Sequence, residues 1–244
     1  MRTCCVSDKG PVRSENQDRG VAVRLKTPRC SILVVCDGMG GANSGSLASS
    51  IAAETYLDRL KRLMTAGKRQ TPSLSRWMQE SCAAANAAVY ERGSNPAHAG
   101  MGTTLVSAVV MGRRAEIINV GDSRAYLVHG KSITQITRDH SVVAELVASG
   151  SLTPEAAAVH PNRNLITRAV GVEPAVESDM YTLRLHRGDR LLLCSDGLSN
   201  TLTETELFSY ARCSRDAALV CQALIDLAVE KGARDNVTAA VAIY

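Results

Sequence analysis

Ser31-Ile-Leu-Val-Val-Cys36-Asp37-Gly38-Met39-Gly40-Gly41 joins an apolar run to a single aspartate and a cluster of glycines. A short run rich in Ile and Val and bounded by glycine is typical of a fully buried β-strand. A carboxylate at the end of such a strand lies at the rim of a sheet, where the core meets solvent. Glycine lets the backbone approach closely whatever the carboxylate holds. The stretch therefore predicts a buried strand that delivers Asp37 to a binding site.

Four further aspartates stand at the ends of strand-like runs. They are Asp196 in Arg190-Leu-Leu-Leu-Cys-Ser-Asp196-Gly197, Asp122 after Ile117-Ile-Asn-Val-Gly121, Asp235 just before Val237–Ile243, and Asp18 in Arg13-Ser-Glu-Asn-Gln-Asp18. Five such residues, three of them beside glycine, indicate one site built from several strands. Hard divalent cations prefer ligand sets made only of oxygen.

Length and composition favour one domain of a cytosolic protein. The 244 residues are 45% hydrophobic, which is enough for a sizeable core, and no linker-like stretch divides them. The eight cysteines show no CxxC spacing, and no signal-peptide or membrane-spanning run is present. We therefore expect a single domain over residues 1–244, with reduced thiols, in the cytoplasm.

Charge and aromatic content bear on the class of partner. The net charge is +4 and is spread along the chain, and aromatic residues make up only 3%. Base stacking needs aromatic platforms, so single-stranded nucleic acid is disfavoured. A small positive surplus is compatible with an anionic, phosphorylated substrate. We expect no nucleic acid partner, no membrane partner and a monomer.

The order of elements predicts an α+β fold with antiparallel sheets covered by helices. Strands are expected at 2–7, 20–26, 31–36, 103–111, 114–120, 123–129, 132–137, 178–185, 190–195 and 236–243, and helices at 45–64, 73–92, 203–211 and 215–231, with a turn at 67–73. Strands spaced as closely as the four at 103–137 form hairpins rather than parallel units. Residues 139–175 resemble an insertion over a site, a flap with a helix at 141–148 and a helix start at Thr153-Pro154-Glu155.

The five aspartates, taken as one cluster, have a chemical consequence. Crowded carboxylates raise one another's pKa unless cations neutralise them, so a real cluster implies metal. Two neighbouring divalent ions can share a water and generate hydroxide at neutral pH. Such a site suits phosphoryl transfer, which depends on positioning and on charge stabilisation. Arg13 lies five residues before Asp18, and the arginine fork suits a phosphate.

Eight short stretches, spread over nearly the whole chain, form an ordered set: Arg13–Asp18, Val35–Gly41, Gly102–Thr104, Val120–Arg124, Thr137–Ser141, Asn164–Gly171, Cys194–Gly197 and Gly232–Thr238. In these stretches and in their order the chain resembles the metal-dependent protein phosphatases of the protein phosphatase 2C type, in their compact bacterial form. Each stretch is a weak signal alone, and the ordered set is highly specific. The family fold is a β-sandwich of two antiparallel sheets with helices on both outer faces.

The resemblance assigns the metal ligands. By it, Asp37 would bridge two Mn²⁺ or Mg²⁺ ions and the Gly38 carbonyl would bind one of them. Asp196 and Asp235 would complete the first metal, and Asp18 would mainly orient a metal-bound water. Asp122, with Asp196, would hold a third and weaker metal.

The resemblance also implies a reaction. Arg13 would hold the substrate phosphate, and the water bridging the metals would attack phosphoserine or phosphothreonine directly, without a phosphoenzyme. The implied protein substrates are a bacterial serine/threonine kinase and the proteins that it phosphorylates. Other phosphatase chemistries lack their motifs, since no Cys is followed six positions later by Arg and no Asp-x-Asp occurs.

Two departures from the family pattern affect the expected mechanism. Met39 stands where many eukaryotic members have His, which leaves the acid for the leaving group undefined. His160, in the flap, resembles a position proposed for that role in bacterial relatives. The interpretation that it is an ordinary solvent-exposed loop histidine has equal weight. Gln17 replaces a Glu of many relatives, which removes a negative charge near the second metal.

Two other functions stay open at this stage. The chain could be a non-catalytic member that binds phosphoproteins, although the complete set of aspartates together with Arg13 argues against it. It could also be a hydrolase of this fold that acts on a small phosphorylated molecule, which only the resemblance argues against.

Overall fold

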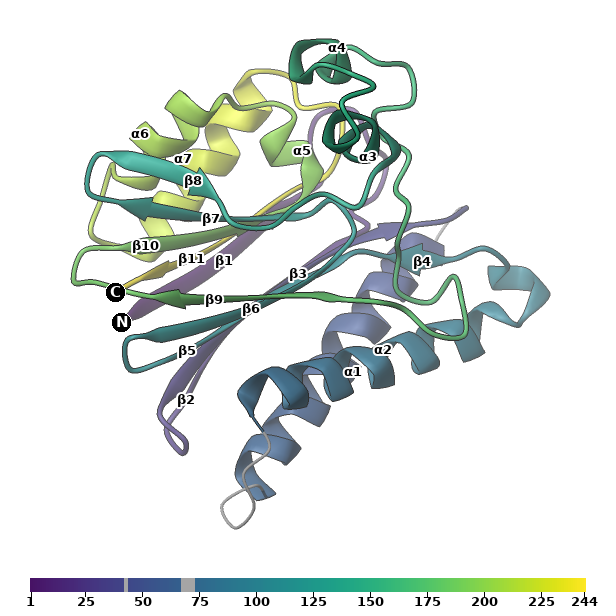
Figure 1. Cartoon of the computed structure of the whole chain (residues 1–244), viewed down its shortest axis with the longest axis horizontal. Helices are drawn as coiled ribbons and strands as arrows, with labels where there is room; N and C mark the ends of the chain where they lie inside the picture. The colour runs from purple at the N-terminus through teal and green to yellow at the C-terminus, as the bar shows by residue number, and fades with distance from the viewer. Residues whose placement is uncertain (42–43, 67–72) are drawn as a thin grey trace.

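The structure is a computed structural model that describes residues 1–41, 44–66 and 73–244. It consists of two antiparallel sheets stacked face to face, with helices on both outer faces (Figure 1). The α+β sandwich predicted from the sequence is therefore confirmed. Most of the expected turn at 67–73 lies outside the described residues.

One sheet has five strands, in the order β1-β11-β10-β7-β8. These are β1 (Arg2–Asp8), β11 (Val237–Ile243), β10 (Arg190–Cys194), β7 (Arg124–His129) and β8 (Ser132–Gln135). The other sheet has the order β2-β3-β5-β6-β9, and β4 pairs with the end of β3. Its strands are β2 (Asp18–Leu25), β3 (Cys30–Met39), β4 (Gly102–Thr103), β5 (Leu105–Met111), β6 (Arg114–Val120) and β9 (Asp179–Arg184).

Helices bury the outer face of each sheet. The sheet that contains β3 is covered by α1 (Ser44–Ala66) and α2 (Leu74–Gly93), and the other by α6 (Glu204–Ala211) and α7 (Ala217–Glu230). Thr203 and Glu206 form the capping box that opens α6, as expected. Among the described residues, no helix is both long enough and apolar enough to span a membrane.

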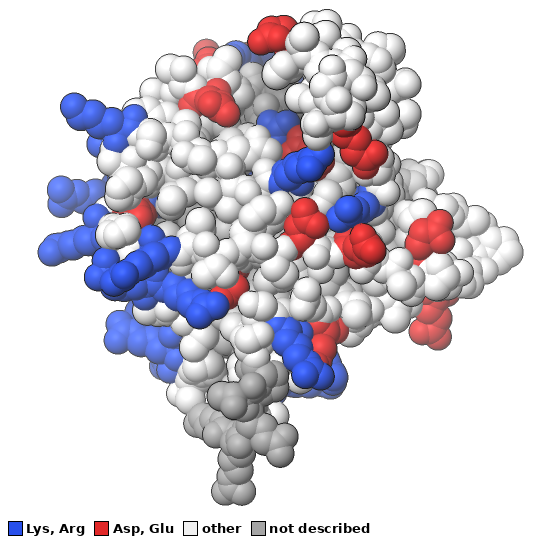
Figure 2. All heavy atoms as spheres, in the orientation of Figure 1, with Lys and Arg blue, Asp and Glu red and all other residues white. Residues whose placement is uncertain are grey.

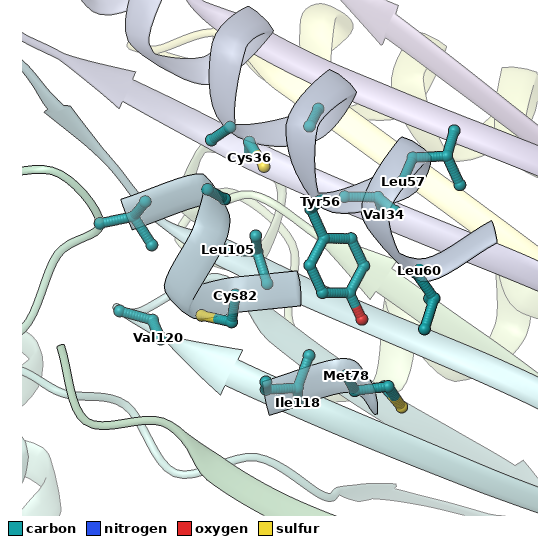
Figure 3. Packing of buried hydrophobic residues seen from close by; sticks show 14 of the residues in the cluster. Val34, Cys36, Tyr56, Leu57, Leu60, Met78, Cys82, Leu105, Ile118 and Val120 are labelled. Carbon is teal, nitrogen blue, oxygen red and sulfur yellow. The ribbon is translucent and has the colours of Figure 1, made fainter. Parts of the chain in front are cut away.

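β3 shows why its sequence is continuously apolar. Ile32, Val34 and Cys36 pack under α1 and α2, whereas Leu33 and Val35 point into the layer between the sheets. Both faces of this central strand are thus buried, so the usual alternation with polar residues is absent. Figure 3 shows side chains from β3, the two helices and neighbouring strands meeting around the ring of Tyr56.

The segment 139–175 crosses one end of the sandwich (Figure 1). It carries α3 (Val142–Ala148) and α4 (Pro154–Ala158), whose N-caps are Ser141 and Thr153. An isolated bridge joins Ser141 to Ile166, and another joins Thr103 to Val170. The first bridge closes the segment on itself, and the second ties its end to β4. Its start is attached to the body by the His140 N–H, which donates to the Gly121 carbonyl oxygen at 3.0 Å.

Three element boundaries near the aspartates differ from expectation. β2 begins at Asp18, two residues early, because Asp18 pairs with Asp37 in the ladder. β3 continues to Met39, since Gly38 and Met39 pair with β4. Asp196 opens the short helix α5 (Asp196–Ser199) directly after β10.

Candidate metal centre

Neighbouring strands of one sheet bring the first two aspartates together. Asp18 and Asp37 are partners in the β2–β3 register. The Asp37 backbone N–H donates to Thr104 Oγ1 at 2.9 Å, and the Asp37 carbonyl accepts from the Thr104 N–H at 2.9 Å. Thr104 thus fixes both the N–H and the carbonyl of Asp37, which orients the Asp37 side chain at the rim.

The other sheet supplies Asp196 and Asp235, and it also holds Asp18. Asp196 follows β10 and Asp235 precedes β11, so both stand at the same end of paired strands. Ser195 Oγ and Thr238 Oγ1 donate to Asp18 Oδ2 at 2.7 and 2.6 Å across the sandwich. Two hydroxyls of one sheet thus fix one carboxylate oxygen of a residue in the other.

Asp122 reaches the same end from the connection between β6 and β7. The next residue, Ser123, is hydrogen-bonded through Oγ to Thr104 Oγ1 at 2.7 Å. Thr104 also accepts from the Asp37 N–H, so one buried threonine links the segments of Asp37 and Asp122. The structure therefore brings all five predicted aspartates to one rim.

Two glycines at this rim have no room for a side chain. A Cβ on Gly38 would meet the Gly45 carbonyl oxygen and would lie 2.7 Å from the Gln17 carbonyl oxygen. A Cβ on Gly197 would meet the Asn236 carbonyl oxygen. The close backbone approach expected of the glycines beside Asp37 and Asp196 is therefore present.

The clustered charges shift the acidity of the aspartates. Burial, with added repulsion from Asp196 and Asp235, raises the pKa of Asp18 to about 7 in spite of its two hydroxyl donors. Burial and the charge of Asp196 raise the pKa of Asp122 to about 7. Burial raises the pKa of Asp37 well above its usual value, with repulsion from the four other aspartates, and burial likewise raises that of Asp196.

Unsatisfied oxygens and the donor chemistry together fit divalent metal. Asp18 Oδ1 and Asp196 Oδ1 are buried and have no hydrogen-bond partner among the described residues. A buried oxygen without a partner is costly unless something else satisfies it. Carboxylates that repel one another at neutral pH are neutralised by a cation, and an all-oxygen set suits Mn²⁺ or Mg²⁺.

Cationic side chains border the aspartates. Arg13 Nη2 bonds Asp235 Oδ2 at 2.6 Å, with the arginine side chain 53% exposed. A cavity of about 380 Å³ beside this pair is lined by Arg13, Arg163, Asn164, Asp196, Lys231, Arg234 and Asp235, with small neighbours. The structure thus places Arg13 at the aspartate rim, in a hollow suited to an anion.

A larger cavity of about 720 Å³ lies between the rim and the flap. Asp122 and Asp196 stand on one side, and α3, α4 and Arg163 on the other. Arg124 and Asp139 also line this cavity. The Arg124 guanidinium donates to the Asp139 carboxylate, from Nε to Oδ1 at 3.0 Å and from Nη2 to Oδ2 at 2.7 Å. His160 lines neither cavity, and its Nδ1 accepts from the Asn162 N–H at 3.1 Å within its own turn.

The family model for protein phosphatase 2C matches residues 12–226. The chain belongs to the protein phosphatase 2C family. The family, the fold and the enzyme class predicted from the sequence, a metal-dependent phosphatase, are confirmed.

Relatives from bacteria agree with this membership. The chain is 37% identical over 237 residues to the serine/threonine phosphatase stp of Listeria monocytogenes serotype 4b, covering 95% of this chain and 91% of the relative. The structure of the serine/threonine phosphatase Stp1 from Staphylococcus aureus matches with a TM-score of 0.88 and 35% identity, over 100% of this chain and 95% of that one. The catalytic domain of the phosphatase PstP, solved with two manganese ions, matches with a TM-score of 0.84 and 33% identity, over 98% of this chain and 96% of that one.

Several residues of this phosphatase site were not predicted from the sequence. Ser195 and Thr238, which hold Asp18, lie 177 and 220 residues away from it in the chain. Arg163 lines both cavities, yet the sequence pattern suggested a role only for His160, three residues earlier. The available signal for Arg163 was its place in a polar Asn-Arg-Asn triplet of the flap. For Ser195 and Thr238 the signal was their position next to the motif aspartates.

The raised pKa values predict how the stability of the metal-free phosphatase depends on pH. Asp18 and Asp122 have pKa values of about 7 in the folded state and an ordinary value of 3.8, so folding takes up protons between these limits. The metal-free protein should therefore be most stable near the lower limit and should lose stability as pH rises toward 7. We expect Tm to be roughly 5 °C higher at pH of about 5.5 than at about 7.5.

Thermal unfolding with and without Mn²⁺ checks this result. Saturating Mn²⁺ should abolish or reverse the trend, because the cation favours ionised ligands. Interactions with His140 and Lys231, among others, lower the pKa values of Asp179 and Glu206. These two carboxyl groups therefore change the stability only at pH values below the range compared here. A metal-free protein whose Tm rises from the lower to the higher pH would contradict the electrostatic picture of the site.

Proposed function

We propose that the protein hydrolyses phosphoserine and phosphothreonine esters in proteins, with divalent metal held by the aspartate rim. The observation that carries this proposal is the convergence of five aspartates from both sheets beside a cation-lined hollow. The acidic group binds metal, and the adjacent arginines suit the phosphate that the metal activates.

Asp37, Asp196 and Asp235, with the Gly38 carbonyl, would hold the metal pair, and Asp122 with Asp196 would hold a third ion. When bound, Mn²⁺ or Mg²⁺ supplies a water of lowered pKa and charge that stabilises the transition state. The sequence resemblance and the unsatisfied oxygens at Asp18 and Asp196 support this assignment.

Asp18 has a distinct role in this proposal. Its Oδ2 is engaged by Ser195 and Thr238, whereas Oδ1 is left without a partner in the described structure. A carboxylate fixed at one oxygen can orient a water through the other and accept its proton. The two hydroxyls therefore act as positioning groups that keep Oδ1 directed into the site.

Arg13 and Arg163 would bind the phosphate from two sides. Arg13 contacts Asp235 before substrate arrives and is half exposed, so its fork can turn toward an incoming anion. Arg163 comes from the flap and lines both cavities. His160 stays a prediction for the leaving-group acid, and its turn would have to move for it to reach the rim.

The setting of the reaction is also part of the proposal. Residues 1–244 act as one catalytic domain, and the flap at 139–175 forms one wall of the larger cavity, where residues around a phosphorylated side chain can lie. The substrate proteins are those phosphorylated by a bacterial serine/threonine kinase in the cytoplasm, and the kinase itself is included. Family membership and the bacterial relatives support this setting.

Hydrolysis of matched phosphopeptides tests the proposed activity. One peptide sequence is prepared with phosphothreonine, phosphoserine or phosphotyrosine, and phosphate release is followed with Mn²⁺. We expect turnover of the first two and loss of on the order of 10³-fold or more in EDTA, with recovery when Mn²⁺ is restored.

Three outcomes would overturn parts of the proposal. Saturable phosphopeptide binding without turnover would indicate a phosphoprotein-binding module. Faster hydrolysis of small phosphate esters, such as sugar phosphates, than of the peptides would indicate a different substrate class. Full activity in EDTA would remove the metal from the reaction.

A further inference from the structure

The sandwich has two electrically different ends. The aspartates occupy one end, and the strand registers define the opposite one. In the five-stranded sheet, Arg2 of β1 pairs with Ile243 of β11, which pairs in turn with Arg190 of β10 and, through it, with Val128 of β7. The start of β1, the end of β11 and the β7–β8 turn therefore lie together, away from Asp196 and Asp235.

The six-stranded sheet contributes to the same end. Leu25 of β2 pairs with Cys30 of β3, and Met111 of β5 pairs with Arg114 of β6, which pairs with Arg184 of β9. A small cavity lined by residues of both sheets, including Met1, Arg24, Arg29 and Tyr244, joins the two halves. We call this whole surface the distal end.

Exposed cations are concentrated on the distal end. From the start of β1, the turns between paired strands and the α6–α7 connection come Arg2, Arg24, Lys26, Arg29, Arg113, Arg114, Lys131, Arg184, Arg187, Arg212 and Arg215. Figure 2 shows Lys and Arg side chains gathered along the edge that carries the chain ends and strand turns in Figure 1.

Carboxylates on the distal end do not cancel this charge. The turns at 24–30, 111–114, 129–132 and 184–190 are fully described and contain one carboxylate, Asp189, which is 3% exposed. The α6–α7 connection adds Asp216, which is exposed and accepts from the Ala218 N–H as the N-cap of α7. Asp189 already bonds His129 Nδ1 at 2.7 Å. Glu116 nearby is buried and forms an ion pair with Arg114. The remaining exposed cations of these turns thus face solvent without a carboxylate of their own.

The pKa of Arg190 shows that cations at the distal end of the five-stranded sheet repel one another. Burial lowers the pKa of Arg190, and the charges of Arg212 and Arg215 lower it further. A surface on which like charges repel gains energy by binding an anion. The aspartate rim is too far away to relieve this repulsion, since the seven residues of β11 span about 23 Å, more than twice the Debye length in physiological salt.

We propose that the distal end binds an anionic membrane surface and holds the catalytic end facing away from it. The cations come from turns of both sheets and are spread over the whole end, which suits an extended charged surface. The strand turns contain no Trp, Tyr or Phe, and Arg212 lies over the ring of Phe208 beside them, which disfavours a row of stacking platforms for single-stranded nucleic acid. Met111, 36% exposed among the arginines, adds an apolar side chain that can enter the headgroup layer.

This surface is separate from the substrate-binding hollow. A phosphoprotein segment bound at the aspartate rim would have to cross the length of the sandwich to reach the distal end. The proposal differs from the sequence expectation of no membrane partner, because that expectation rested on the lack of an apolar run long enough to span a bilayer. A net charge does not show where the charged residues lie, and the strand registers are what place the basic residues together at one end.

Vesicle co-sedimentation of the whole chain tests the proposal. Phosphatidylglycerol-containing vesicles are compared with pure phosphatidylcholine vesicles in the presence of Mn²⁺. We expect binding to the anionic vesicles alone, and its loss when NaCl is raised to about 0.5 M. Each basic residue near such a surface changes the partition coefficient by about fivefold.

A matched pair of triple variants makes the test specific. Arg24→Gln, Arg29→Gln and Arg187→Gln remove exposed cations of the distal end for which the structure shows no ion pair. Lys9→Gln, Arg19→Gln and Arg92→Gln instead remove exposed cations nearer the aspartate rim, and each triple lowers the net charge from +4 to +1. The first triple should lower vesicle binding about 100-fold and the second by much less, with phosphatase activity in solution unchanged in both.

Three results would overturn the proposal. The first is no binding to anionic vesicles at low salt. The second is an equal loss in both triple variants, which would reduce the effect to net charge. The third is stronger binding of polyglutamate or of duplex DNA than of vesicles by the same face, which would assign it to an acidic protein or to nucleic acid.

Discussion

Asp37→Asn should abolish turnover and leave the fold in place. The amide keeps the shape of the side chain but removes the charge that faces Asp18, Asp196, Asp122 and Asp235. The metal pair then loses the ligand expected to bridge it. We expect kcat with Mn²⁺ to fall by at least about 10³-fold for p-nitrophenyl phosphate and phosphopeptides. Without metal, Tm should stay level or rise, because repulsion among the aspartates is relieved.

Asp58→Asn is the matched control. Asp58 is exposed on α1, and the same chemical change there should leave kcat, metal dependence and Tm unaltered. Steady-state kinetics over a range of Mn²⁺ concentrations, together with thermal unfolding, measures both variants. If Asp37→Asn retained full turnover at saturating Mn²⁺, the assignment of Asp37 to the metal centre would be wrong.

Gly38→Ala should be the most damaging of the small substitutions. The new methyl group would meet the Gly45 carbonyl oxygen and would lie 2.7 Å from the Gln17 carbonyl oxygen. Both obstacles are backbone atoms, so the β3 end or the start of α1 must shift. Such a shift displaces Asp37 and the Gly38 carbonyl together. We expect kcat to drop by about 100-fold or more, a cost typical of misplacing reacting groups by about 1 Å.

Gly41→Ala separates this steric effect from the general effect of losing a glycine. A Cβ on Gly41 meets no atom of the described residues within 4 Å, although Gly41 belongs to the same glycine cluster. Its kcat and Mn²⁺ affinity should stay within about twofold of the parent, since surface changes away from special features are usually small. Equal losses in both variants would show that chain flexibility, and not close backbone approach, accounts for the effect.

Much of the fold was predictable because its local signals agree with one another. The apolar run at 31–36 is buried on both faces, and the close strands at 105–135 form the expected hairpins. The motif aspartates follow or precede strands, and the two glycines beside Asp37 and Asp196 are needed for close backbone contact. In these stretches the local sequence pattern and the tertiary packing favour the same residues.

Other features depend on pairings that no local pattern encodes. The extension of β3 to Met39 requires β4, which lies more than sixty residues later. The hydrogen bonds of Ser195 and Thr238 to Asp18 cross between the sheets. Arg163 reaches both cavities because the flap folds back over the rim, while His160 is engaged in its own turn. The cations of the distal end occur in small groups along the sequence and meet only through the strand registers.

Anomalous scattering from a crystal soaked in manganese tests the central claim most directly. The account predicts at least two manganese peaks at the aspartate rim, with carboxylate oxygens of Asp37, Asp196 and Asp235 within about 2.0–2.6 Å of them. It also predicts that both peaks disappear in Asp37→Asn. Density absent from this rim at saturating manganese, or found instead only at His129, His186 and Asp189, whose potential ligand atoms lie within 4.8 Å of one another, would contradict it.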